Sequence, residues 1–224
     1  MWDDLIIMFT LSEENYLKAI FHLETISGSG ISTNSIANKL ETKASSVTDM
    51  VKKLAEKEVL IYKKYQGVSL TELGRRTAAS VIRKHRLWEV FLVEKLNFSW
   101  DEVHDVAEQL EHIKSPKLIN ELDAFLGYPK TDPHGDPIPD EHGKFHKIEK
   151  RRLSTLQENE SGVCVGVDDS SASFLKYLDK YQISLGKTIQ VISIEPFDGS
   201  LSIKVDGKDI SISNKISNNI YIQS

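Results

Sequence analysis

Apolar residues at helical spacing mark the first part of the chain. Ser12 is suited to cap a helix that ends near residues 28–30. The apolar positions of this helix are Tyr16, Leu17, Ile20 and Phe21. A short helix is expected over residues 35–40, and a third over residues 44–57 after a brief turn. Two helices joined in this way predict a helix-turn-helix.

The spacing of apolar residues then changes from helical to strand-like. Residues 59–65 and 68–70 are rich in β-branched and aromatic side chains and flank a Gln66-Gly67 turn. The pattern predicts a β-hairpin beside the helix-turn-helix. Residues 1–73 are therefore expected to form a winged helix-turn-helix domain.

Three more helices are expected within a second domain over residues 74–147. A long helix spans residues 71–96, a second begins after the capping box at residues 99–102, and a third covers residues 115–126. The proline-rich segment that follows is expected to be a loop. The helices carry so much apolar surface that a homodimer is the simplest way to bury it.

Short strand-like segments dominate residues 148–224. They cover residues 163–167, 187–194, 201–205, 209–213 and 220–223. Asp198-Gly199 and Asp206-Gly207 are typical of hairpin turns, and a short helix is expected near residues 173–181. The pattern predicts a small SH3-like β-barrel. The fold class is thus mainly α with a small β domain.

Composition is that of an ordinary globular protein. The chain has 224 residues, of which 40% are hydrophobic and 27% are charged. No segment approaches the ~20 apolar residues of a membrane span, and the start of the chain lacks the features of a secretory leader. The single cysteine, Cys164, fits a reducing compartment. We therefore expect a cytoplasmic protein that has no membrane contact.

Charge is distributed unevenly along the chain. Residues 31–90 contain 12 Lys and Arg against 6 Asp and Glu, a balance of +6. Residues 91–150 contain 7 against 13, a balance of −6. The first balance suits a polyanion such as DNA, and the second suits cations.

Histidine and carboxylate side chains gather in the middle helices. His85 and Glu89 are four residues apart, so a helix places them on one face. The next predicted helix carries a second set: His104, Glu108, Glu111 and His112. Imidazole and carboxylate groups from two neighbouring helices are the ligands expected for a first-row divalent metal. A solvated charged face is the alternative interpretation.

The second helix of the helix-turn-helix offers small polar side chains to base edges, and lysines lie nearby for phosphates. The candidate DNA-binding residues are Thr33, Lys43, Ser45, Ser46, Thr48, Asp49, Lys52, Lys53, Lys63 and Lys64. The positive charge of this half of the chain favours DNA, although a winged helix can also serve protein contacts.

Three further histidines fall in or just after the proline-rich segment. His134, His142 and His146 stand among glycines and prolines without a spacing typical of metal ligands. We interpret them as loop residues.

The order of winged helix, histidine-rich helices and small barrel resembles the diphtheria toxin repressor family of metal-dependent transcriptional repressors, which includes manganese transport regulators. The resemblance covers nearly the whole chain. It is carried by five motifs, at residues 14–20, 45–48, 84–89, 103–112 and 133–139. It also implies that the C-terminal barrel is of the FeoA type.

The resemblance implies two metal sites in each subunit. The activating site falls on Asn15, Glu108, Glu111 and His112. The ancillary site falls on His85, Glu89 and His104. Iron-responsive members have a cysteine where this chain has Glu108, so its oxygen ligand suits Mn²⁺, with Fe²⁺ as the alternative. Lys18 stands where some manganese regulators have a glutamate of a paired metal site, which favours two separated sites.

The implied function is repression of metal-ion uptake genes by a homodimer that binds palindromic double-stranded operators when metal is bound. Metal would select the spacing of the two recognition helices that fits both half-sites. Two alternatives are a metal-dependent hydrolase and a winged-helix regulator whose His/Glu cluster is only structural.

Overall fold

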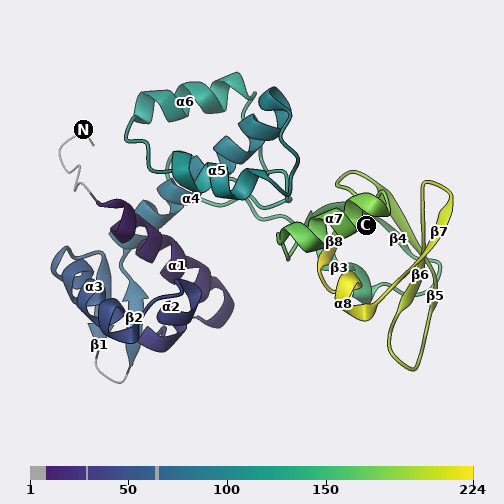
Figure 1. Cartoon of the computed structure of the whole chain (residues 1–224), viewed down its shortest axis with the longest axis horizontal. Helices are drawn as coiled ribbons and strands as arrows, with labels where there is room; N and C mark the ends of the chain where they lie inside the picture. The colour runs from purple at the N-terminus through teal and green to yellow at the C-terminus, as the bar shows by residue number, and fades with distance from the viewer. Residues whose placement is uncertain (1–8, 29, 64–65, 224) are drawn as a thin grey trace. The chain divides into compact units, whose positions relative to one another are not determined.

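The computed structural model describes residues 9–28, 30–63 and 66–223, which form two compact units. The first unit holds the described residues up to His85, together with residues 110–115 and 139–145. The second unit holds residues 86–109, residues 116–138 and the described residues from His146 onward. Figure 1 labels the helices and strands of both.

The first unit contains the predicted helix-turn-helix and hairpin, which are confirmed. Helices α1 (Leu11–Ser27), α2 (Thr33–Lys39) and α3 (Ala44–Glu56) precede the antiparallel strands β1 (Leu60–Lys63) and β2 (Gly67–Leu70). These helices gather around the hairpin in Figure 1. Their fully buried apolar residues are Leu17, Ile20, Ile36, Val47, Val51, Leu54 and Val68.

The start of α1 differs from the sequence-based expectation. Thr10, and not Ser12, is the N-cap: its hydroxyl accepts the backbone N–H of Glu13, and the Glu13 carboxylate accepts the N–H of Thr10. This reciprocal pair satisfies two amide donors at once. Ser12 could not form the same pair, because the residue three positions after it is Asn15 and not Glu or Gln. The helix therefore includes Glu13 and Glu14 in its first turn.

Helix α4 (Glu72–Leu96) runs from the first unit into the second. It is followed by α5 (Val103–Leu110) and α6 (Pro116–Phe125). Glu111 and His112 were expected on the same helix as Glu108, but α5 ends before them and they lie in a turn, in which the Ile113 N–H bonds to the Leu110 carbonyl. Pro116 disfavours a helical backbone at Ser115, so the helix cannot continue into α6.

The C-terminal part of the second unit is the predicted small antiparallel β domain, which is confirmed. A six-stranded sheet has the order β3-β8-β4-β5-β6-β7. Its strands are β3 (Arg151–Arg152), β4 (Ser161–Val167), β5 (Thr188–Ile194), β6 (Leu201–Val205), β7 (Lys208–Ile212) and β8 (Ile220–Gln223). The short helices η1 (Leu153–Thr155), α7 (Ala172–Lys180) and α8 (Asn214–Ser217) accompany it.

The β domain has its own core. Phe174, Leu175 and Leu178 of α7 pack with the inward side chains of the strands. The partly buried Trp100, which lies between α4 and α5, packs against the same core. Trp100 therefore anchors the start of α5 to the β domain. The expected boundaries at residues 73/74 and 147/148 stay a prediction.

Among the helices of the described residues, none is long and apolar enough to span a membrane.

Candidate metal centre

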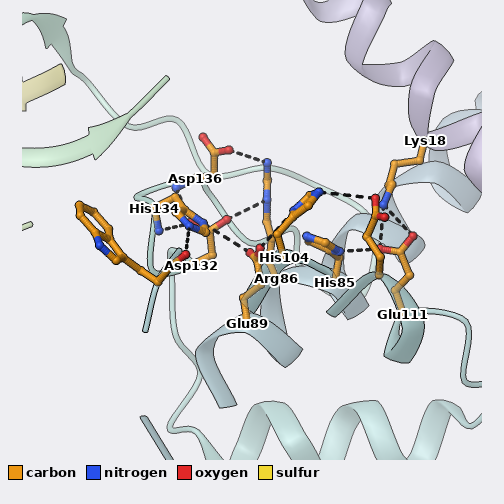
Figure 2. A network of polar contacts seen from close by, with 11 residues as sticks. Lys18, His85, Arg86, Glu89, His104, Glu111, Asp132, His134 and Asp136 are labelled. Atoms are coloured by element: carbon orange, nitrogen blue, oxygen red, sulfur yellow. Dashed lines mark hydrogen bonds and ion pairs between the residues drawn. The ribbon is translucent and has the colours of Figure 1, made fainter. Parts of the chain in front are cut away.

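Glu111 is the centre of a polar cluster within the first unit. Its side chain is fully buried, and both of its oxygens accept hydrogen bonds from the Lys18 ammonium, at 2.7 and 2.8 Å. His85 Nδ1 lies 2.6 Å from Glu111 Oε2. Figure 2 shows Lys18 and His85 pointing toward this carboxylate. Helix α1, helix α4 and the turn after α5 thus meet at a single buried acid.

His112 belongs to the same cluster. Its Nδ1 lies 2.5 Å from Glu14 Oε2, and its Nε2 lies 3.7 Å from Glu111 Oε1. Lys84 Nζ lies 3.7 Å from the other oxygen of Glu14. Because Glu14 and Lys18 are four residues apart, α1 places both on one face. The cluster contains two carboxylates, two imidazoles and two ammonium groups.

Electrostatics keeps Glu111 ionised. Burial alone would raise its pKa, but the hydrogen bond with His85 and the charge of Lys18 outweigh burial and lower the pKa below 4.5. Burial also lowers the pKa of Lys84, while the charges of Glu14 and Glu111 oppose that shift. A buried, ionised carboxylate beside two imidazoles is a donor set that fits a divalent cation.

The cluster includes some of the expected activating residues. Glu111 and His112 lie together, whereas Asn15 is exposed and its neighbour Glu14 makes the contact with His112. Glu108 is half exposed on α5, where its carboxylate lies 3.6 Å from His104 Nε2. Glu14 was missed because an acid in the first turn of a helix usually serves the helix dipole.

A second group of candidate ligands lies within the second unit. Glu89, Asp132 and His134 are all buried, and each offers a ligand atom within 4.8 Å of the others. His104 Nδ1 also lies 3.7 Å from Glu89 Oε1. Of the expected ancillary residues, Glu89 and His104 are thus close together, and His85 precedes Glu89 by one turn of α4.

The surroundings of the second group favour a cation. Figure 2 shows Arg86 between Asp132 and Asp136, with ion-pair distances of 3.3 and 3.2 Å. Burial and the charges of Glu89 and Asp136 raise the pKa of Asp132 to about 7. Burial would lower the pKa of His134, but Glu89 and Asp132 raise it to about 9. Three carboxylates thus lie beside a guanidinium and an imidazole, and carboxylate and imidazole groups are ligands that suit a divalent ion.

Trp100 fixes the ring of His134. The Trp100 carbonyl lies 2.8 Å from His134 Nε2, and the two rings stack at 6.3 Å. The Trp100 indole N–H donates to Asp179 of α7. With Nε2 directed at a carbonyl, Nδ1 is the nitrogen that faces Glu89 at 3.8 Å.

His134 lies in a loop, as expected, but the structure buries it beside Glu89 and Asp132, where it is a candidate metal ligand. Its spacing in the sequence hides this role, since the ligands are brought together by tertiary contacts. His142 and His146 are exposed, as expected of loop residues. The sequence signal that pointed to His134 was the motif Pro133-His134-Gly135, in which it lies.

The candidate DNA-binding side chains lie on and near α3. Exposed ones are Lys43, Ser45, Ser46, Asp49, Lys52, Lys53 and Lys63. Thr33 and Thr48 are half buried, and Thr48 donates to the Ala44 carbonyl. Lys53 lies 3.1 Å from the buried Glu13, so it also stabilises the fold. Lys64 lies outside the described residues.

Comparisons with known proteins cover nearly the whole chain. The family described as iron dependent repressor, N-terminal DNA binding domain, matches residues 8–68. The family described as iron dependent repressor, metal binding and dimerisation domain, matches residues 71–140, and the FeoA domain matches residues 151–224.

Individual relatives agree with the family matches. The diphtheria toxin repressor of Corynebacterium jeikeium is 29% identical over 182 residues, which are 81% of this chain and 75% of that protein. A solved manganese-dependent transcriptional repressor in complex with manganese is 34% identical, with a TM-score of 0.84, over 95% of this chain and 99% of that one. ScaR with bound Cd²⁺ is 35% identical, with a TM-score of 0.77, over 94% and 98%.

Proposed function

Because the chain belongs to the iron-dependent repressor family of metal-dependent, DNA-binding transcriptional repressors, we propose that it represses metal-uptake genes when Mn²⁺ is bound, with Fe²⁺ as the alternative. It is a transcriptional regulator that binds DNA as a homodimer, and not an enzyme, so the hydrolase alternative is excluded. A repressor of chromosomal genes acts in the cytoplasm. The operator is a palindrome, because a two-fold dimer presents two equivalent recognition helices.

Ligand chemistry supports Mn²⁺. The candidate ligands are carboxylates and imidazoles, which suit Mn²⁺ and Fe²⁺. The single thiol, Cys164, is buried in the core of the β domain, and burial raises its pKa to about 11. Relatives of known structure include a manganese-dependent repressor with manganese bound.

Two metal sites in each subunit are proposed. The activating site uses Glu111 and His112, with Glu108 and with Asn15 or its neighbour Glu14 from α1. The ancillary site uses Glu89, joined by His85 and His104 or by Asp132 and His134. The buried position of Glu89 and the contacts of Glu111 with α1 support these assignments.

The observation that carries the proposal is the meeting of α1 with Glu111 and His112. Leu17 and Ile20 of α1 lie in one hydrophobic core with buried residues of α2 and α3 in the DNA-binding domain. The turn after α5 belongs to the metal-binding and dimerisation part of the sequence. These acids and imidazoles would hold a divalent cation, which would supply coordination bonds between α1 and the turn. The chain's own residues then keep α1 at a fixed position relative to that turn.

The three segments have distinct roles in this proposal. Residues 1–73 bind DNA, residues 74–147 bind metal and dimerise, and residues 148–224 form the FeoA-type domain. The exposed lysines near α3 contribute affinity for phosphates that does not depend on sequence.

Replacing Glu111 by Gln tests the proposal. We expect the Mn²⁺-dependent part of operator binding to fall ~10–100-fold, because a buried charged ligand is lost, while weak salt-sensitive DNA binding persists. The measurement is a gel-shift titration on the promoter upstream of the chain's own gene, with Mn²⁺, Fe²⁺ and Zn²⁺. His142→Ala, which changes a side chain that is 82% exposed, is the control. An undiminished Mn²⁺ response of Glu111→Gln would contradict the site.

A further inference from the structure

Lys18 makes the same kind of contact with Glu111 that a metal ion makes with a carboxylate ligand. Its ammonium donates to both carboxylate oxygens, at 2.7 and 2.8 Å, and Glu111 is fully buried. His85 Nδ1 occupies a further position on Oε2 at 2.6 Å. A carboxylate held in this way has its charge and its lone pairs satisfied by the protein.

The cluster around Glu111 is already balanced in charge. Glu14 and Glu111 bring two negative charges, and Lys18 and Lys84 bring two positive charges. A divalent cation added to this set would leave an excess of positive charge in a buried place, which is unfavourable. Withdrawal of one ammonium group lowers this excess from +2 to +1.

Lys18 is the ammonium group that can withdraw. Its side chain is 14% exposed, so it reaches the edge of the cluster, and its four-carbon stem allows the ammonium to move to solvent without a change in α1. Because the Lys18 ammonium contacts both oxygens of Glu111, a metal cannot take these two oxygens while Lys18 stays in place.

We infer that Lys18 is a built-in cation that competes with the activating metal for Glu111 and sets the metal concentration at which the repressor responds. This inference rests on the proposed function, because it takes Glu111 as a metal ligand. Lys18 is a specificity-determining residue in this role. It keeps Glu111 ionised and in place. It also weakens metal binding, because the ion pair between Lys18 and Glu111 must be broken before a metal can bind Glu111.

A second lysine–glutamate pair serves as a matched control, with Glu13 on α1 and Lys57 at the end of α3. Lys57 Nζ lies 2.7 Å from Glu13, whose side chain is also fully buried. The Lys57 side chain is 28% exposed. Both pairs join a lysine to a buried acid, but Glu13 is not among the proposed ligands. Loss of Lys57 should therefore affect folding without affecting metal affinity.

The test compares Lys18→Met, Lys18→Arg, Lys57→Met and Glu111→Gln in the full-length chain. Calorimetric titration with Mn²⁺ gives the affinity, and thermal unfolding with and without Mn²⁺ gives a second readout. Because two metal sites are proposed, the titration can show two binding events. The event that Glu111→Gln weakens is assigned to the activating site, and affinities are compared for that event. Lys18→Met should bind Mn²⁺ there ~10–100-fold more tightly, since a charge-assisted pair no longer has to be broken.

The other variants complete the expected pattern. Lys18→Met should unfold at a lower temperature without metal and gain more from Mn²⁺ than the unaltered protein. Lys18→Arg keeps the cation and should bind Mn²⁺ as weakly as the unaltered protein. Lys57→Met should lose stability at unchanged affinity.

Two outcomes would overturn the inference, and they are distinguishable. If Lys18→Met binds Mn²⁺ no more tightly while Glu111→Gln weakens binding, then Glu111 is a ligand and the competition is absent. If Glu111→Gln leaves Mn²⁺ affinity unchanged, the activating site itself is misassigned and the inference fails with it.

Discussion

Gly135 is the residue on which the position of His134 most directly depends. Its φ of +86° lies in the left-handed region, and a Cβ atom there would lie 2.0 Å from the Val165 carbonyl oxygen. Beside it, the Val167 N–H of β4 donates to the His134 carbonyl at 2.9 Å. The loop that carries Asp132 and His134 is therefore pressed against the β domain, which holds both candidate ligands next to Glu89.

Gly135→Ala is expected to loosen this loop. The change should destabilise the protein by about 2–4 kcal/mol, from left-handed strain together with the steric clash. It should also weaken Mn²⁺ binding at the second group of candidate ligands, Glu89, Asp132 and His134. Urea unfolding and Mn²⁺ titration are the measurements. Gly186→Ala is the control, because Gly186 has φ +83° with nothing near its missing Cβ, and it should cost only about 1 kcal/mol.

At the scale of elements, Glu24 joins three parts of the DNA-binding unit. It lies near the end of α1 and is 7% exposed. Its Oε1 accepts the backbone N–H of Leu70 in β2 at 2.9 Å, and its Oε2 lies 2.7 Å from Arg75 of α4. One carboxylate thus ties the hairpin to two helices.

Glu24→Ala should destabilise the protein by about 2 kcal/mol, because a buried amide and a guanidinium lose their acceptor. Glu24→Gln keeps an acceptor for Leu70 and should cost less. Urea unfolding measures both. The matched control is Glu72→Gln, which removes an exposed pair with Arg76 at 3.5 Å and should change stability by less than about 0.5 kcal/mol. Equal losses at Glu24 and Glu72 would contradict the role of Glu24.

Elements were more predictable from the sequence than the candidate sites. Helical and alternating periods identified the helix-turn-helix, the hairpin and the β domain, because burial of one face imposes those periods. The end of α5 before Glu111 and the cap at Thr10 depend on local competition between turn and helix. Asp132 and His134 could not be predicted as candidate ligands, because Arg86, Trp100 and β4 position them from distant parts of the sequence.

At the scale of the whole molecule, the account depends on linkage between metal and DNA. In the proposed function, the positive first part of the chain binds DNA, and the acids of the middle part are the proposed metal ligands. Glu111 and His112 contact α1, which shares one core with α3, the proposed recognition helix. Any ligand that favours this arrangement shifts the population toward the form that fits the operator.

The most direct measurement of this linkage is the Mn²⁺ affinity of the full-length dimer with and without operator DNA. Linkage is reciprocal, so DNA should tighten Mn²⁺ binding by the same factor by which Mn²⁺ tightens DNA binding, ~100-fold for a coupling of about 2.7 kcal/mol. Glu111→Gln should reduce that factor to nearly one. A factor that remains at its full value in Glu111→Gln, or operator affinity that does not depend on Mn²⁺ in the unaltered protein, would contradict the account.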